Sequence, residues 1–262
     1  MPDPELPHLL ILGGTAEAAA LAAAVLARFA GRARVTTSLA GRTRRPQPIA
    51  GNLRIGGFGG ADGLVAYLAA ERVDAVIDAT HPFAAQISAQ AEAACAAAGV
   101  KRLLLRRPPW QRHPLDRWIE VDDAAGAAAA LPALGRRVWL TIGGRGLDTF
   151  AHLRTHHFLL RLVEPPAAPP PLATCEILLG RGPFNLENER RIIARHGIEV
   201  VVAKAAGGAA TEAKLVAARE RNLPVVMIRR PPPPPGPCVD SVSAALDWLG
   251  EWLPRLREEA VQ

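Results

Sequence analysis

Short apolar runs that end at glycine recur along the first half of the chain. His8 to Leu12 is such a run, and it stops at Gly13-Gly14, as a buried parallel strand does. Further short strands are expected over 34–38, 53–55, 75–79 and 102–105. Helices rich in strong helix formers are expected between them, over 15–29, 64–71 and 82–98. The first half therefore reads as strands and helices in alternation.

The same pattern begins again in the second half. Strands are expected over 137–142, 157–163, 176–179, 198–203 and 225–228. Helices are expected over 186–196 and 211–220, with a terminal helix that packs through Leu246, Trp248, Leu249 and Trp252. Short connections between alternating elements imply parallel sheets with right-handed crossovers. We predict an α/β protein with two Rossmann-like domains, residues 1–134 and 135–262, and a cleft between them that binds ligands at the strand ends.

Composition places the chain among globular proteins of the cytoplasm. It has 262 residues, of which 49% are hydrophobic, and no run of about 18 uncharged apolar residues that could span a membrane. The N-terminus lacks the basic region that precedes the apolar part of a secretory signal. Cys95, Cys175 and Cys238 are far apart and have no metal-ligand spacing. We expect no metal and no disulfide, and a small buried hydrophobic role for each cysteine.

The charge balance favours an acidic small molecule as ligand. The chain has 31 basic and 25 acidic residues, a net charge of +6. That excess is mild for a nucleic-acid-binding protein, and no basic run is interleaved with aromatic residues. Nucleic acid is therefore not an expected partner, whereas a polyanionic small molecule is.

A glycine turn between the first strand and the first helix could hold a pyrophosphate. Gly13-Gly14-Thr15-Ala16-Glu17 lets the backbone come close to a ligand, and the helix start presents amides to it. Thr15 and Ala18 stand where the usual Gly-x-Gly-x-x-Gly pattern has its second and third glycines. The same residues are equally consistent with an ordinary tight turn, in which Glu17 favours the helix dipole.

The end of the second strand favours NADPH over NADH. An NAD-binding fold usually has an acidic residue there, about 20 residues after the glycines, to hold the ribose hydroxyls. The segment from Thr36 to Arg45 contains hydroxyls and arginines and no acid. Thr37, Ser38 and Arg42 suit the extra phosphate of NADPH. The alternative is a solvated basic loop.

Two further groups of residues are expected at strand ends. Asp78-Ala79-Thr80-His81-Pro82-Phe83 closes the fourth strand, so that Thr80 and His81 face the cofactor or the substrate. A histidine there can donate to a carboxylate or supply a proton. In the second half the cations at strand ends are Arg145, Arg181 and Lys204. Three cations at equivalent positions would bind a polyacid and steer its approach.

These segments together resemble the precorrin-6A reductase family. The resembling stretches are Ile11 to Glu17, Gly41-Arg42-Thr43, Asp78 to Ala84, Gly180 to Phe184, and Lys204 with Gly207-Gly208. They extend from residue 11 to the Arg229-Arg230-Pro231 segment, so nearly the whole chain is covered. The Thr-His-Pro-Phe segment is the specific part. Many relatives have Lys-x-Ser-Gly-Gly at the position of Lys204. In this chain Ala206 stands in place of the serine.

The resemblance implies an NADPH-dependent reduction of one macrocycle double bond, which converts precorrin-6A to precorrin-6B in cobalamin synthesis. The first domain would bind NADPH and the second the tetrapyrrole. The expected cofactor residues are Gly13, Gly14, Thr15, Glu17, Thr37, Ser38, Arg42 and Thr80. The expected substrate residues are Arg44, His81, Arg145, Arg181 and Lys204. His81 is also the candidate catalytic residue, as proton donor, beside water or a substrate carboxyl group.

Other readings stay open at this point. A short-chain dehydrogenase does not fit, because Tyr67 is the single tyrosine and no lysine follows four residues later. A cobalt-bearing precorrin-6A is an alternative substrate, and a non-catalytic NADPH sensor is an alternative function. The expected partners are the tetrapyrrole and, transiently, neighbouring enzymes of the pathway.

Overall fold

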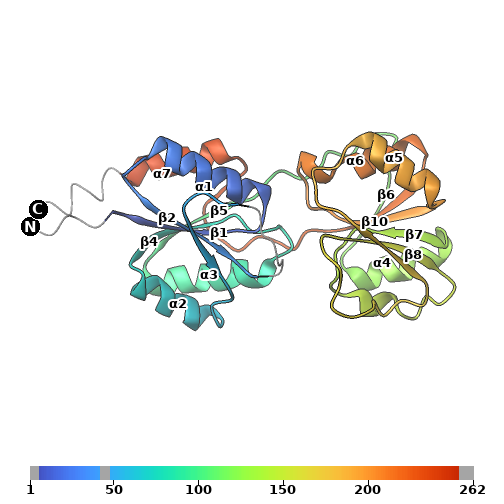
Figure 1. Ribbon diagram of the computed structural model, residues 1–262, viewed down its shortest axis with the longest axis horizontal. Coiled ribbons are helices and arrows are strands. Elements are labelled where there is room, and N and C mark those ends of the chain that lie inside the picture. Colours follow the sequence, from blue (N-terminus) through green and yellow to red (C-terminus); the bar gives the residue numbers. More distant parts are fainter. Residues whose placement is uncertain (1–5, 42–47, 254–262) are drawn as a thin grey trace, which may run out of the picture. The chain divides into compact units, whose positions relative to one another are not determined.

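The computed structural model describes residues 6–41 and 48–253, which form two compact units (Figure 1). Unit 1 comprises Met1–Arg107 and Pro231–Gln262, and unit 2 comprises Pro108–Arg230. Each unit contains a six-stranded sheet in which all neighbouring strands are parallel. The predicted α/β class with two parallel sheets is confirmed. No helix in the described ranges is both long and apolar enough to cross a membrane.

Unit 1 alternates strands and helices as the sequence pattern predicts. Its strands are β1 (His8–Leu12), β2 (Arg34–Leu39), β3 (Asn52–Ile55), β4 (Val73–Asp78), β5 (Lys101–Leu105) and β12 (Cys238–Val239). Its helices are α1 (Ala16–Arg28), α2 (Ala61–Ala70), α3 (Ala85–Ala98) and α7 (Val242–Trp252). The α1 helix begins at Thr15, whose side chain accepts a hydrogen bond from the amide of Ala18. Gly99 ends α3 in the left-handed conformation.

Unit 2 has the same alternation with shorter helices. Its strands are β6 (Arg117–Val121), β7 (Arg137–Leu140), β8 (His157–Leu162), β9 (Cys175–Leu179), β10 (Val200–Lys204) and β11 (Pro224–Ile228). Its α-helices are α4 (Ala124–Ala130), α5 (Leu186–Arg195) and α6 (Ala213–Glu220). Three 3₁₀ turns lie at Leu131–Ala133, Leu147–Phe150 and Ala209–Thr211.

The two sheets share the same spatial order of strands. In unit 1 it is β3-β2-β1-β4-β5-β12, the usual order of dinucleotide-binding α/β folds. In unit 2 it is β9-β8-β7-β10-β11-β6, the same arrangement, except that the strand at the last position comes first in the chain. Each passage of the chain from one unit to the other therefore supplies the last strand of a sheet.

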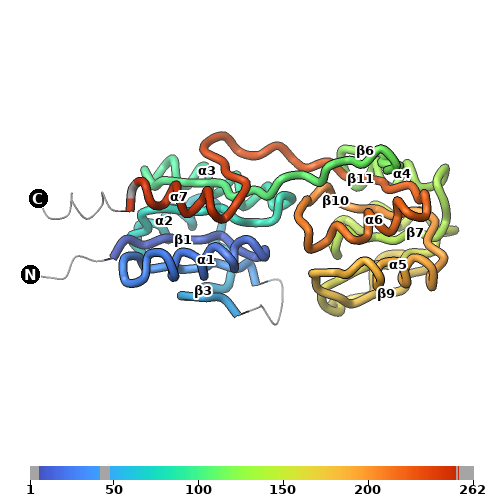
Figure 2. Tube along the Cα trace, turned by 90° about the horizontal axis from the view of Figure 1, so that it is seen from above, coloured from blue at the N-terminus to red at the C-terminus, as the bar shows by residue number. Residues whose placement is uncertain are grey.

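This exchange corrects the predicted boundary at residue 134. The β6 strand pairs with β11, so β6 and α4 belong to unit 2. The β12 strand pairs with β5, and α7 packs beside α1, so the C-terminal part returns to unit 1. The chain thus passes between the units twice, in the green segment near Arg107 and in the orange-red segment near Arg230 (Figure 2).

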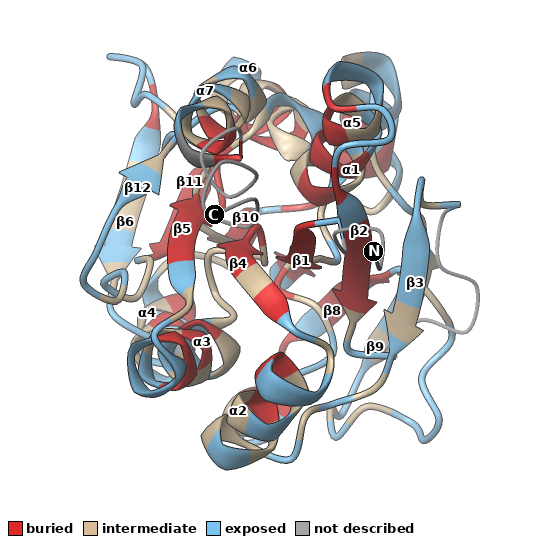
Figure 3. Ribbon diagram, turned by 90° about the vertical axis from the view of Figure 1, so that its left-hand side faces the viewer, coloured by how far each residue is buried: buried red, intermediate tan, exposed pale blue. Residues whose placement is uncertain are grey.

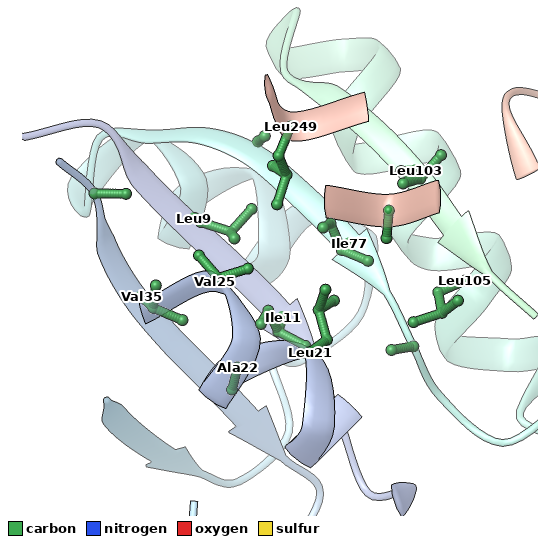
Figure 4. Packing of buried hydrophobic residues seen from close by; sticks show 14 of the residues in the cluster. Leu9, Ile11, Leu21, Ala22, Val25, Val35, Ile77, Leu103, Leu105 and Leu249 are labelled. Atoms are coloured by element: carbon green, nitrogen blue, oxygen red, sulfur yellow. The ribbon is translucent and has the colours of Figure 1, made fainter. Parts of the chain in front are cut away.

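Helices cover both faces of the unit 1 sheet. The α1 and α7 helices lie on one face, where Leu9, Ile11, Leu21, Val25 and Leu249 belong to one buried cluster (Figure 4). The α2 and α3 helices cover the other face, over Leu10, Leu12 and Val76. The central strands are buried and the edge strand β3 is exposed (Figure 3). Central strands buried on both faces explain the nearly continuous apolar runs of the sequence.

Some expected details of the elements are wrong. The helix that was expected to begin at Pro82 begins at Ala85. Residues 82–84 instead form a turn, in which the amides of Phe83 and Ala84 donate to His81. Of the cysteines, Cys95 is buried, whereas Cys175 is partly buried and Cys238 is exposed. Burial raises the pKa of the Cys95 thiol to about 11, so this thiol stays protonated and packs as an apolar group.

Candidate functional site

The predicted cofactor residues of unit 1 that the structure describes lie at one edge of its sheet. Gly13 and Gly14 follow β1, Ser38 lies near the end of β2, and Thr80 and His81 follow β4. The β1 strand lies between β2 and β4, and all three are parallel, so their carboxyl ends share one edge. The strand order reverses between β1 and β4, which is where ligands of such sheets bind.

The glycine turn is shaped for a close backbone approach. A Cβ atom on Gly13 would lie 2.8 Å from the Thr37 Cγ2 atom, so only glycine lets β1 turn against β2 here. Gly14 has φ +105°, and a Cβ built on it would meet nothing within 4 Å. The turn leads directly into α1, whose first amides can bind a phosphate. These features fit a pyrophosphate.

The Thr15 hydroxyl is used inside the protein. It donates to the carbonyl of Ala79 at 2.7 Å and accepts from the amide of Ala18 at 3.1 Å. Its single proton therefore joins the α1 start to the end of β4. The hydroxyl proton is therefore not available to a phosphate in this geometry, although the backbone around Thr15 stays at the site.

At the end of β2 the two predicted hydroxyls differ. Thr37 is fully buried, and its methyl group packs beneath Gly13, so we assign it to packing. Ser38 is 6% exposed, and its Oγ accepts from a guanidinium nitrogen of Arg54 at 3.2 Å. Arg42 and Arg44, which were expected to bind the cofactor and the substrate, lie outside the described residues.

Arg54 is a cation at this edge that the sequence reasoning missed. It lies directly opposite Ser38 in the pairing of β2 with β3. Its guanidinium carbon is 3.9 Å from the centre of the Phe58 ring and 5.0 Å from that of Tyr67. The available signal was the arginine inside the short predicted strand 53–55, but only the strand register places it beside Ser38.

The end of β4 is organised by a buried carboxylate. Asp78 is fully buried, and its Oδ1 accepts from the Thr80 amide at 3.1 Å and from the Thr80 hydroxyl at 2.6 Å. The Thr80 hydroxyl also lies 3.3 Å from the Ser88 Oγ. Asp78 thus fixes the turn that presents His81, and the Thr80 side chain is part of this support.

The hydrogen bonding of His81 bears on the tautomer of its ring. The amide of Phe83 donates to the His81 Nδ1 at 3.2 Å. An imidazole that accepts at Nδ1 carries its proton on Nε2 in the neutral form. His81 is thereby suited to donate a hydrogen bond through Nε2.

Glu17 has an ion-pair partner that was not predicted. Its carboxylate lies 2.9 Å from a guanidinium nitrogen of Arg107, and both side chains are partly buried. A carboxylate in the first turn of α1 would repel a pyrophosphate, and the Arg107 cation offsets that charge. We therefore interpret Glu17 as a residue that holds Arg107 near the helix start.

The three predicted cations of unit 2 also lie at a carboxyl edge. Lys204 is the last residue of β10, Arg181 follows β9, and Arg145 lies in the loop after β7. The strands β9, β8, β7 and β10 are neighbours and parallel, so these strand ends lie at the same edge of the sheet. Arg145 and Arg181 are exposed. A guanidinium nitrogen of Arg181 lies 3.9 Å from a carboxylate oxygen of Glu164.

The loop after Lys204 is clamped by surrounding backbone. A Cβ on Gly207 would lie 2.0 Å from the Pro108 carbonyl oxygen, and Gly207 has φ +67°. Arg230 donates to the Ala205 carbonyl at 2.5 Å and to the Pro108 carbonyl at 2.9 Å. Ala206 stands where many relatives have serine. Its side chain is buried, and it has no hydroxyl that could contact a ligand.

A buried ion pair supports the loop that carries Arg181. Two guanidinium nitrogens of Arg161 bind the two carboxylate oxygens of Glu189, each at 2.8 Å. The Arg161 guanidinium stacks between the rings of Trp139, at 4.4 Å, and Phe184, at 4.0 Å. A Cβ on Gly180 would lie 3.3 Å from the Phe184 ring. The stack therefore fixes the turn from Gly180 to Phe184.

The described residues offer no metal centre. Across 6–41 and 48–253, no three or more histidine, cysteine, aspartate or glutamate side chains gather as metal ligands would.

Comparison with known proteins identifies the family. The family of precorrin-6x reductases, CbiJ/CobK, matches residues 8–250. The chain belongs to this family. A precorrin-6A reductase of Rhodococcus erythropolis is 50% identical, over 94% of this chain and 98% of that protein. A precorrin-6A reductase of Rhodobacter capsulatus is 46% identical, over 94% of this chain and 97% of that protein.

A solved structure supports the same assignment. The structure of CobK precorrin-6A reductase has a TM-score of 0.88 and 47% sequence identity, over 94% of this chain and 97% of that chain. The chain is accordingly an oxidoreductase, and the relatives' names imply a nicotinamide cofactor.

Proposed function

We propose that this protein reduces one macrocycle double bond of precorrin-6A with NADPH and forms precorrin-6B in cobalamin synthesis. The observation that carries the proposal is the carboxyl edge of unit 1, which has a pyrophosphate-type turn and no acid at the end of β2. The names of its relatives supply the substrate. The same proposal places the reaction in the cytoplasm.

On the cofactor side, backbone and cations would do most of the binding. The amides at the α1 start and the open face of Gly14 suit the pyrophosphate. Ser38, and Arg42 four residues later in the sequence, suit the ribose phosphate of NADPH. When bound, NADPH supplies a hydride, and one proton completes the reduction of the double bond.

On the substrate side, unit 2 would bind the acid groups of the tetrapyrrole. Arg145, Arg181 and Lys204 carry three positive charges at one sheet edge. A guanidinium binds a carboxylate through two parallel hydrogen bonds, so arginines orient such a substrate as well as attract it. The role of unit 2 is therefore to hold the macrocycle in a defined orientation.

His81 would bind the substrate as a hydrogen-bond donor. Its Nδ1 accepts from the Phe83 amide, so the ring proton of that tautomer is on Nε2, the atom proposed to donate to a substrate carboxylate. We propose that His81 positions the substrate through Nε2, and the candidate proton donors are His81, water and a substrate carboxyl group.

One experiment separates this function from its two alternatives. The protein is mixed with NADPH and metal-free precorrin-6A, and cofactor absorbance is followed together with the mass of the tetrapyrrole. We expect steady oxidation of NADPH and a tetrapyrrole heavier by two hydrogens. NADPH binding without turnover would mean a sensor. Turnover with cobalt-precorrin-6A but not with the metal-free substrate would mean that the true substrate carries cobalt.

A further inference from the structure

We propose that Arg54 selects NADPH over NADH by binding the phosphate on the adenosine ribose. This inference rests on the proposed function, because it takes NADPH as the cofactor of unit 1. It adds a residue from β3, a strand that precedes α2 at the edge of the sheet.

The place of Arg54 in the fold is the first argument. Sheets with this strand order hold the adenosine ribose at the end of the second strand. Here that strand is β2, and Ser38 near its end pairs directly with Arg54. The Arg54 guanidinium lies 3.2 Å from the Ser38 Oγ. A phosphate on the ribose hydroxyl would therefore meet a hydroxyl and a cation together.

The fixed position of the guanidinium is the second argument. Its two terminal nitrogens donate to the carbonyls of Gly56, at 2.6 Å, and Gly57, at 2.8 Å. The Phe58 ring lies beneath it at 3.9 Å. An arginine held in this way loses little conformational entropy when it binds a phosphate.

The charge of Arg54 is the third argument. Its hydrogen-bond partners among the described residues are a serine hydroxyl and two backbone carbonyls, and its ring partners are Phe58 and Tyr67. All of these groups are neutral, so none of them compensates the positive charge. A doubly charged phosphate is the ligand that would do so.

A purely structural role is the competing explanation. The hydrogen bonds to Gly56 and Gly57 could serve only to brace the turn between β3 and α2. Such a role predicts that loss of Arg54 weakens all adenosine ligands alike, or none. A role in selection predicts that only the phosphorylated ligand is affected, so the two explanations differ in a measurable way.

The test compares two small ligands, AMP and AMP that carries a second phosphate on the ribose 2′-hydroxyl. Affinities are measured by calorimetry for the wild type, Arg54→Gln, Arg54→Lys and the control Arg34→Gln. Arg34 lies at the opposite end of β2 and pairs with Glu71. We expect Arg54→Gln to weaken the phosphorylated ligand by about 10-fold or more and AMP by about twofold or less. Arg54→Lys should lie between, and Arg34→Gln should match the wild type.

Three results would overturn the inference. Equal losses for both ligands in Arg54→Gln, or no loss for either, would leave Arg54 a structural residue while the NADPH assignment stands. A wild-type protein that binds both ligands equally would instead contradict the NADPH assignment itself. AMP binding by each variant shows that its site is folded.

Discussion

At the scale of single residues, the hydroxyls near the glycine turn serve the protein before any ligand. Thr15 joins α1 to β4, Thr80 binds Asp78, and Ser38 accepts from Arg54. The sequence showed that these hydroxyls lie near strand ends. It could not show their partners, because Thr15 and Ala79, for example, are 64 residues apart. Hydrogen-bond partners of this kind depend on the strand register.

The double role of the Thr15 hydroxyl predicts a loss of stability rather than of affinity. Thr15→Val removes both the N-cap acceptor and the donor to Ala79, and should lower the free energy of unfolding by about 1–2 kcal/mol. Thr15→Ser keeps the hydroxyl and is the matched control. Urea unfolding and NADPH titration measure the two effects. A stable Thr15→Val protein with much weaker NADPH binding would mean that the hydroxyl contacts the cofactor.

The buried His8 predicts a dependence of stability on pH. Its Nε2 lies 2.8 Å from the Thr36 hydroxyl, and burial lowers its pKa below the usual value, with the Arg34 cation acting in the same direction. The unfolded chain gains a proton near about pH 6.5 while the folded protein still holds a neutral ring. The free energy of unfolding should therefore be constant well above that pH and fall as the pH drops below it.

Urea unfolding between about pH 8 and pH 5 measures this effect. His8→Gln lacks the titrating group and should show a shallower fall than the wild type. His156, whose pKa is also lowered mainly by burial, contributes to the fall that remains. Wild type and His8→Gln with identical pH profiles would contradict the assignment to His8.

At the scale of elements, the sequence pattern was a good guide to most strands and helices and a poor guide to their partners. It missed β6, whose residues are exposed or partly exposed and so lack an apolar run, and the two-residue β12. It also missed the short α4. These are the elements that each sheet receives after the chain has crossed between units. Local periodicity does not record such long-range pairing, and the predicted boundary was wrong for that reason.

The Arg161–Glu189 pair predicts a large loss of stability when one of its charges is removed by a single substitution. Glu189→Gln would leave the Arg161 cation without its charged partner, in a place where their side chains are 8% and 0% exposed. Loss of one member of a buried pair costs about 3–5 kcal/mol. Glu187→Gln, in the same first turn but 66% exposed, should cost less than about 1 kcal/mol.

Chemical denaturation of the two variants measures that difference, and hydrogen exchange locates it. In Glu189→Gln we expect faster exchange in α5 and in the turn from Gly180 to Phe184, because the stack on Phe184 depends on Arg161. Equal and small costs for the two variants would show that the pair contributes little.

At the scale of the whole molecule, the net charge of +6 and the three cations at the carboxyl edge of unit 2 predict salt-sensitive substrate binding. Added salt screens exposed charges, with a screening length of about 10 Å at 0.1 M and about 3 Å at 1 M. KM for precorrin-6A should therefore rise several-fold over this range. The affinity for a ligand without carboxylates should change little. A KM independent of salt would contradict an electrostatic role for unit 2.

The central claim is that a hydride passes from NADPH to the macrocycle on this protein. It is tested most directly with NADPH in which both hydrogens on the transferring carbon of the nicotinamide are deuterium. Mass spectrometry of the tetrapyrrole after turnover should show one deuterium and one ordinary hydrogen added for each NADPH oxidised. A tetrapyrrole that stays unreduced, or that is reduced without deuterium, would contradict the account.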